Sequence, residues 1–223
     1  MFDRTPTRPE PTSDLPTLDP GVTVLRPPVP RSPALHRLVA DTLLDESGPA
    51  YWIDARNAVM TQLLYDHVPA RRMLAGLMAA RAFTAYQHHE LVRGLPGTAR
   101  PGTRLVVVPN AASLYRDGDV PGAEADRLLE ASLSVLTELA AAFDCPVLLT
   151  TTGEDAHAER VVDAADTVVD CERTRLGLAY DAPGFTSSGF HRDGYWQTTI
   201  PYWVDLLGRI VPREPGVTPG VNA

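Results

Sequence analysis

The sequence contains no lysine, and all twenty of its basic residues are arginine. This absence excludes a phosphate-loop lysine, a Schiff-base lysine and a lysine general base. Acidic residues number 28, and the formal net charge is −8. An acidic surface repels a nucleic-acid backbone unless arginines gather locally, so the composition disfavours autonomous DNA binding. A GC-rich genome and adaptation to salt would each produce the same composition.

Cysteine and long apolar runs are also scarce. Cys145 and Cys171 are the only cysteines and do not have the spacing of metal ligands, so we expect two reduced thiols rather than a disulfide. No apolar run reaches the length of a membrane span, and no signal peptide opens the sequence. These features predict a cytoplasmic protein.

Strand and helix patterns alternate through the first 170 residues, which predicts an α/β fold with a mainly parallel sheet flanked by helices. The expected strands are 22–25, 50–54, 80–84, 105–108, 146–150 and 167–170. The expected helices are about 34–46, 57–79, 87–93, 123–143 and 156–164, and the region 57–79 is either one helix or two short helices split by Pro69. Later strands are expected at 176–180 and 195–200, and a final helix at about 202–211. We expect a disordered, proline-rich tail over 1–20, a core domain over 21–211 and a disordered tail over 212–223.

The loop after the first expected strand contains no glycine. Residues 26–33 read Arg-Pro-Pro-Val-Pro-Arg-Ser-Pro, so four of the eight are prolines. In nucleotide-binding α/β proteins this loop cradles phosphates with several backbone N–H groups. Proline has no N–H, and its fixed φ opposes such a nest. The sequence therefore predicts a nucleotide-binding architecture whose phosphate loop has been replaced.

Four short segments, in this order and spacing, resemble the ATPase core of the RecA superfamily, nearest to its archaeal and eukaryotic Rad51/RadA branch. They are Tyr51–Asp54, Ala80–Phe83 with Gln87 and His88 beyond, Leu105–Arg116, and Leu148–Thr152. The resemblance runs from about Val22 to about Gly208. It implies a RecA-like fold with extra C-terminal strands and a final helix, and a role in DNA recombination and repair.

The residues at the family's catalytic positions are changed in this sequence. Arg56 stands where the family has the glutamate that prepares the attacking water, and Pro109 replaces the aspartate that helps to hold magnesium. Of the phosphate-binding residues, only the hydroxyl of Ser32 remains. Three parts of a phosphoryl-transfer site are missing. We therefore expect no nucleotide cofactor, no metal and no ATP hydrolysis.

The resemblance also implies a partner-binding strand. In Rad51-like proteins the strand that matches Ala80–Phe83 receives a Phe-x-x-Ala segment from a neighbouring subunit or a mediator, through backbone pairing at its exposed edge. Ala80 and Ala82 keep the small size that leaves room for the incoming phenylalanine. A RadA/Rad51-type recombinase or a second copy of the chain is thus expected to contact Ala80, Ala82 and Phe83. The alternative is that both alanines are ordinary small residues beneath a helix.

Two other functions stay open. A divergent ATPase would use Arg26, Arg31 and Asp54 in a rearranged site. A DNA-binding module would use the only tight basic clusters, Arg26 with Arg31 and Arg71 with Arg72, for anion or DNA contacts.

The remaining polar clusters predict solvated surface rather than a ligand site. His88 and His89 are adjacent, so on a helix their side chains diverge by about 100°, and no further ligand stands at a metal-like spacing. A solvated or capping role is expected for them. Residues 116–126 are net acidic and lack the ligand alternation of a calcium loop. They stand where the family's first DNA-contacting loop is expected, and the second, at 153–156, is short. DNA binding is therefore expected to be weak or indirect.

Overall fold

The computed structural model describes residues 15–45, 48–175, 177–187, 189–192 and 195–198. The chain divides into two compact units, residues 1–187 and 188–223, which are described separately. In the second unit β9 (Gly189–Arg192) and β10 (Tyr195–Thr198) form an antiparallel pair. The expected final helix at 202–211 and tail at 212–223 lie outside the described residues, as do residues 1–14 of the expected N-terminal tail.

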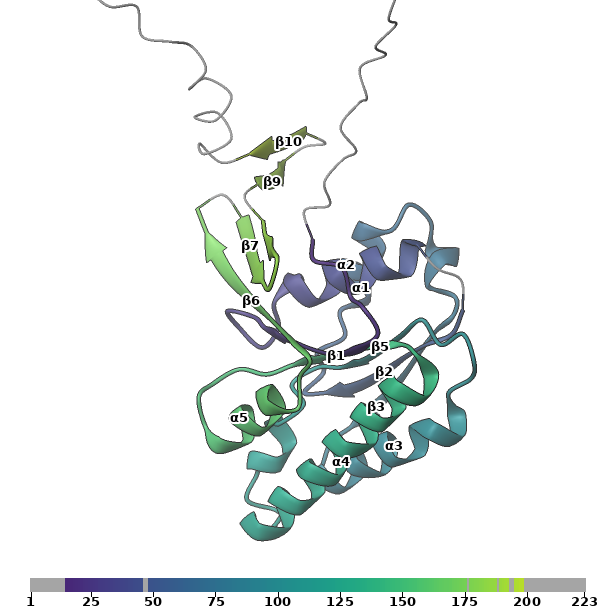
Figure 1. The fold of residues 1–223 in the computed structure, drawn as a ribbon, viewed down its shortest axis with the longest axis vertical. Helices are drawn as coiled ribbons and strands as arrows, with labels where there is room; N and C mark the ends of the chain where they lie inside the picture. Colours follow the sequence, from purple (N-terminus) through teal and green to yellow (C-terminus); the bar gives the residue numbers. More distant parts are fainter. Residues whose placement is uncertain (1–14, 46–47, 176, 188, 193–194, 199–223) are drawn as a thin grey trace, which may run out of the picture. The chain divides into compact units, whose positions relative to one another are not determined.

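The first unit is organised around an eight-stranded sheet in the order β3-β2-β4-β5-β1-β6-β7-β8 (Figure 1). Six strands run parallel: β1 (Gly21–Arg26), β2 (Ala50–Ala55), β3 (Leu77–Ala82), β4 (Leu105–Val108), β5 (Pro146–Thr150) and β6 (Thr167–Thr174). β7 (Gly177–Ala182) and β8 (Phe185–Thr186) extend it in antiparallel fashion. The predicted α/β class with a mainly parallel sheet is confirmed.

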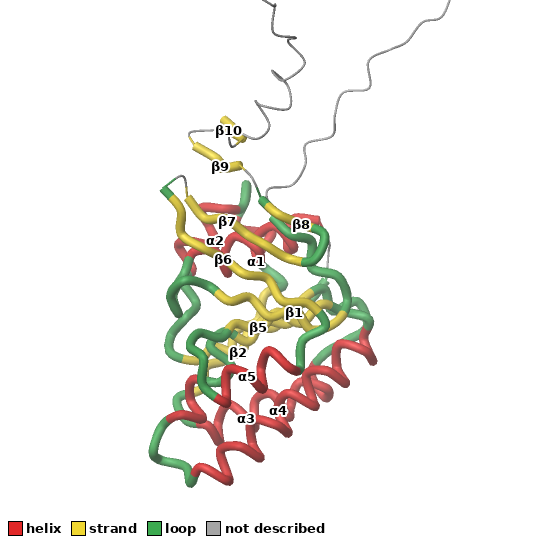
Figure 2. The backbone as a smooth tube through the Cα atoms, turned by 60° about the vertical axis from the view of Figure 1, so that its left-hand side comes forward, coloured by secondary structure: helices red, strands yellow, loops and turns green. Residues whose placement is uncertain are grey.

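Helices cover both faces of this sheet (Figure 2). One face packs against α3 (Ala85–Thr98), α4 (Gly122–Phe143), α5 (Ala156–Asp163) and the 3₁₀ helix η2 (Ser113–Arg116). The other face packs against α1 (Pro33–Asp45) and α2 (Thr61–His67), with the 3₁₀ helix η1 (Arg71–Leu74) beside them. Apolar central strands of a parallel sheet are buried on both faces, which is the reason for this arrangement.

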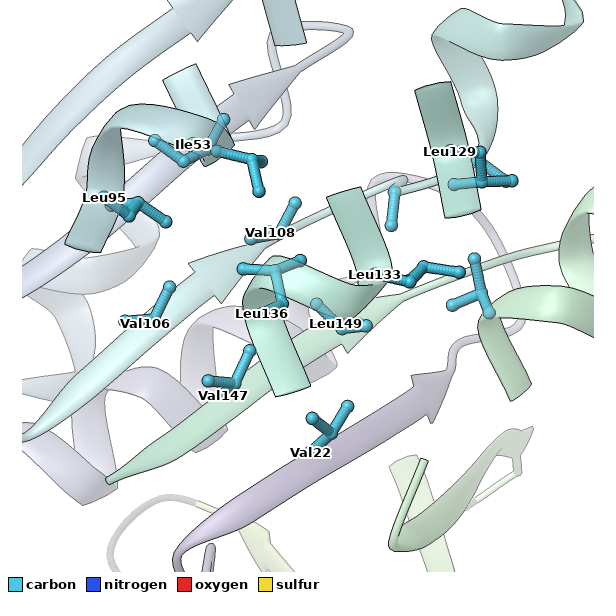
Figure 3. Packing of buried hydrophobic residues seen from close by; sticks show 14 of the residues in the cluster. Val22, Ile53, Leu95, Val106, Val108, Leu129, Leu133, Leu136, Val147 and Leu149 are labelled. Carbon is cyan, nitrogen blue, oxygen red and sulfur yellow. The ribbon is translucent and has the colours of Figure 1, made fainter. Parts of the chain in front are cut away.

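Successive side chains along each strand point to opposite faces of the sheet, so the hydrophobic core has two layers, one on each face. Val106 and Val108 of β4 point toward α3 and α4 (Figure 3), and Val107 points to the α1 face. Opposite them, α4 buries leucines such as Leu133 and Leu136 at helical spacing. Each fully buried side chain of this kind stabilises the fold by about 1.5–3 kcal/mol.

The expected helix over 57–79 and strand over 80–84 are wrong at their shared boundary. The helical part consists of α2 and η1 with Pro69 between them, as in the two-helix alternative, but β3 already begins at Leu77. Gly76 marks the change, because a Cβ there would meet the Gly48 carbonyl oxygen at 2.7 Å. The Gly76 carbonyl accepts the Ala50 N–H (2.9 Å), and Leu77 then pairs with Ala50 in the parallel register.

Helix α3 is longer than the expected 87–93. Thr84 caps its start, because the Thr84 side chain accepts a hydrogen bond from the Gln87 N–H, and Gln87 Oε1 accepts one from the Phe83 N–H (2.9 Å). The helix continues through Pro96 to Thr98. The Thr-x-x-Gln spacing is the sequence signal for this start.

Residues 15–20 differ from the expected disordered tail. Leu15 and Leu18 are buried in the core layer that contains α1. Their apolar contacts hold this segment against the sheet, which a reading based on the surrounding prolines does not predict.

Candidate functional site

The carboxyl ends of the parallel strands are the place to look for a ligand site, because open α/β sheets bind ligands in the crevice outside these ends. Here this edge is formed by the loop after β1, the turn after β2, the segment from β4 into η2, and the loop between β5 and α5. Each of these segments makes hydrogen bonds or ion pairs with other parts of the same chain.

The loop after β1 does not present a phosphate cradle. The Ser32 N–H donates to the Val29 carbonyl (3.1 Å), and the Ser32 hydroxyl accepts the Ala34 N–H (3.2 Å). Pro33 has no N–H to offer. Ser32 and Ala34 are buried together with His36, so the first turn of α1 is covered by the protein itself. An anion site at a helix N-terminus needs free N–H groups that face solvent or ligand.

His36 ties α1 to the turn that follows β2. Its Nε2 accepts the Met60 N–H (2.9 Å), and its ring lies 5.6 Å from the ring of Trp52. Burial lowers the pKa of His36 below its ordinary value. The imidazole is therefore neutral at pH 7 and acts as a structural acceptor.

Asp54 holds the turn after β2 rather than facing a substrate. Its Oδ1 accepts the N–H groups of Ala58 (2.7 Å) and Val59 (3.2 Å), and its Oδ2 accepts Arg81 Nε–H (2.9 Å). The turn contains Arg56 and Asn57 at φ +60° and +56°, a strained pair for residues other than glycine. Asp54 compensates this strain by accepting hydrogen bonds from the next two backbone N–H groups, and both of its carboxylate oxygens have partners.

Four arginines along this edge are each paired with an aspartate. The pairs are Arg26 with Asp170 (2.6 Å), Arg81 with Asp54 (2.9 Å), Arg56 with Asp117 (2.6 Å) and Arg116 with Asp155 (2.7 Å). Such pairs add little to stability where they are solvent-exposed. They do neutralise the guanidinium charges at the place where a triphosphate would need them.

Two of these pairs also bind the loops to each other. Arg56 donates to the Ser113 carbonyl (2.8 Å) as well as to Asp117, and Arg116 donates to the Thr152 carbonyl (3.2 Å) as well as to Asp155. Asp155 is at the same time the N-cap of α5. Residues 116–126 and 153–156, where the resemblance places DNA-contacting loops, are thus joined to one another through Arg116 and Asp155.

The structure places the predicted anion-contacting arginines at two separate positions. Arg26 and Arg31 lie at the carboxyl edge, where Arg31 donates to the Asn57 carbonyl (2.6 Å). Arg71 and Arg72 lie in η1, with the Arg71 guanidinium 4.4 Å above the ring of Tyr65. Within η1, the Met73 carbonyl accepts a hydrogen bond from Arg104, the residue before β4, so η1 lies at the amino edge of the sheet. The two clusters therefore do not combine into one basic site.

The predicted partner strand is at the edge of the sheet, since β3 pairs only with β2 among the described strands. Ala80 packs against the α3 layer and Ala82 is buried, in contact with Ala55 and Leu114. Ala82 therefore has no free space beside it for an incoming side chain. Phe83 is 71% exposed.

Sequence reasoning missed two exposed residues in the same segment. Met78 is 48% exposed and Tyr86 is 44% exposed. The described part of the chain has four exposed large hydrophobic residues, and three of them lie between positions 78 and 86. The expected helix over 57–79 includes Met78, and this assignment conceals the exposed strand edge.

The pair His88 and His89 does not have the expected solvated or capping role. His88 is buried, its Nδ1 lies 2.7 Å from the Tyr115 hydroxyl, and that hydroxyl lies 3.0 Å from Ser132 Oγ. His89 Nδ1 also lies 3.0 Å from Ser132 Oγ. Burial lowers the pKa of His88 to about 4 and raises that of Tyr115 to about 12, so both are neutral at pH 7. This network joins α3, η2 and α4.

Neither a metal cluster nor a membrane-spanning helix occurs within the described residues. No group of three or more metal-ligating side chains gathers there. No helix in this part of the chain is long and apolar enough to cross a membrane. In comparisons with known proteins, no protein-family model matches the chain, and no curated protein matches it.

Proposed function

We propose that this protein is a non-catalytic member of the RecA/Rad51-like group that acts through protein contacts, as an accessory to a recombinase in DNA recombination and repair. The mainly parallel sheet with helices on both faces is consistent with a RecA-like fold. The assignment to repair rests on the resemblance of the four sequence segments, because a fold alone does not determine function.

The carboxyl edge supports the non-catalytic part of this proposal. A phosphoryl-transfer site needs unpaired cations, a magnesium ligand and a residue that orients the attacking water. Here Arg26, Arg56 and Arg116 are neutralised by aspartates, and Asp54 accepts hydrogen bonds from two N–H groups of its own turn and from Arg81 of β3. The same pairs reduce the positive charge that these three arginines offer to a nucleic-acid backbone.

The observation that carries the proposal is the exposed edge of β3. An edge strand presents unpaired N–H and C=O groups, and a partner can add a strand to it. Met78 and Phe83 offer apolar contacts beside this edge, and burying such side chains is the main gain in most protein associations. The partner under this proposal is a RadA/Rad51-type recombinase.

A pull-down with the recombinase from the same cell tests the proposal. We expect Phe83→Asp to weaken capture at least tenfold, because it places a charge in the apolar part of the contact. Val29→Asp is the matched control, since Val29 is exposed (52%) but lies in the loop after β1. Equal capture of the wild type and Phe83→Asp, or no capture of the wild type, would refute the proposal.

A further inference from the structure

The edge formed by β3 lacks the features that usually protect an edge strand. Natural edges are protected by proline, lysine, bulges or very short strands. β3 is six residues long, contains no proline, and pairs in continuous register with β2 from Leu77 to Ala82. Its single charged residue, Arg81, donates to Asp54 on the neighbouring strand.

The opposite edge of the sheet is protected. The last strand there, β8, consists of only Phe185 and Thr186. A head-to-tail assembly would have to pair the six residues of β3 with this two-residue strand. An assembly that pairs β3 with β3 uses two equal strands and ends at a short strand on both sides.

We propose that β3 pairs with β3 of a second copy of this chain, antiparallel and around a two-fold axis, to form a closed homodimer. This inference rests on the proposed function, because it uses the same exposed edge of β3. It adds a second copy of the chain as a molecule that binds this edge. Directly opposite residues of an antiparallel pair point to the same face, so a symmetric register must be centred on a residue that faces its own copy.

The sequence of β3 fits such a register with Ala79 at the centre. Ala79 is exposed, and its methyl group leaves room for the same methyl group of the second copy. Met78 then lies opposite Ala80, and Leu77 lies opposite Arg81. No arginine faces an arginine, and Met78, the exposed large hydrophobic side chain of the strand, faces the small side chain of Ala80.

Sedimentation of the purified full-length protein at concentrations from 1 to 100 μM, on the order of typical homodimer affinities, tests this inference. We expect a species of twice the chain mass of 24.2 kDa. Ala79→Asp places two carboxylates face to face across the axis, so we expect at least a tenfold weaker dimer. Ala131→Asp is the matched control, because Ala131 is exposed on α4 and the same charge there should leave the dimer unchanged.

A charge-swap experiment separates a specific contact from a general effect of charge. Ala79→Arg alone is also expected to be monomeric, whereas an equimolar mixture of Ala79→Asp and Ala79→Arg should dimerise again. A monomeric wild type, an Ala79→Asp protein that dimerises like the wild type, or a mixture that stays monomeric would each overturn the inference. No recombinase is present in the sedimentation measurement. A monomeric result would therefore overturn the homodimer but would not decide whether the chain binds a recombinase in the pull-down.

Discussion

Replacing Asp54 separates a structural role from a catalytic one. Asp54 accepts two backbone N–H groups of the strained turn and one N–H of Arg81, and its side chain is 1% exposed. In Asp54→Ala the Ala58 N–H remains buried without its acceptor, which costs about 1–3 kcal/mol, and the half-buried Val59 N–H costs less. The Arg81 side chain is 43% exposed, and its guanidinium can bond to water instead. Losing the Arg81–Asp54 ion pair therefore lowers the free energy of unfolding by less than about 1 kcal/mol. We expect a total loss of about 3 kcal/mol.

Urea denaturation at pH 7 measures this loss as a lower midpoint at unchanged slope. Asp54→Asn is the matched control, because its amide oxygen still accepts both turn N–H groups and only the bond to Arg81 is lost. We expect it to cost about 1 kcal/mol. An Asp54→Ala protein as stable as the wild type would refute the structural role. Steady phosphate release by the wild type that disappears in a fully stable Asp54→Ala would support the divergent ATPase instead.

Three further predictions address acid sensitivity, thiol reactivity and the edge strand. The pKa of His88 is lowered from 6.5 to about 4 in the folded chain. As the pH falls below 6.5, the unfolded chain therefore binds a proton at His88 before the folded chain does. The free energy of unfolding should fall by up to about 3 kcal/mol between pH 6.5 and pH 4. This loss should be absent in His88→Gln, and an equal pH dependence of the two proteins would contradict it. Burial raises the pKa of Cys145 and Cys171 to about 11, so neither thiol should react with a thiol reagent at pH 8 until the protein is unfolded; rapid native labelling would contradict this. Ala82→Glu should reduce soluble, folded protein, because it buries a carboxylate against Ala55 and Leu114, and a normally folded variant seen by circular dichroism would refute that packing.

Long, regular patterns in the sequence were sufficient to predict the centre of the fold. The apolar run at β4, the strand at β5 and the helical spacing of α4 lie within one residue of their expected positions. Their burial on both sides leaves a strong and simple pattern. β3 was misplaced because Leu77 and Met78 fit a helix face equally well, and only the pairing with β2 decides between the two structures.

The closure of the carboxyl edge was predictable only in part. The prolines of the loop after β1 already exclude a phosphate cradle, and this follows from the sequence alone. The ion pairs do not follow from it, because Arg56 and Asp117 are 61 residues apart and Arg26 and Asp170 are 144 residues apart. Single-sequence patterns report local periodicity, whereas these contacts depend on the order of the strands.

Calorimetric titration of the full-length protein with ATP and Mg²⁺ tests the central claim most directly. Because Arg26, Arg56 and Arg116 are paired with the chain's own aspartates, and Ala34 and His36 in the first turn of α1 are buried, we expect no saturable heat up to millimolar nucleotide. Binding of one ATP per chain with a micromolar Kd would contradict the account.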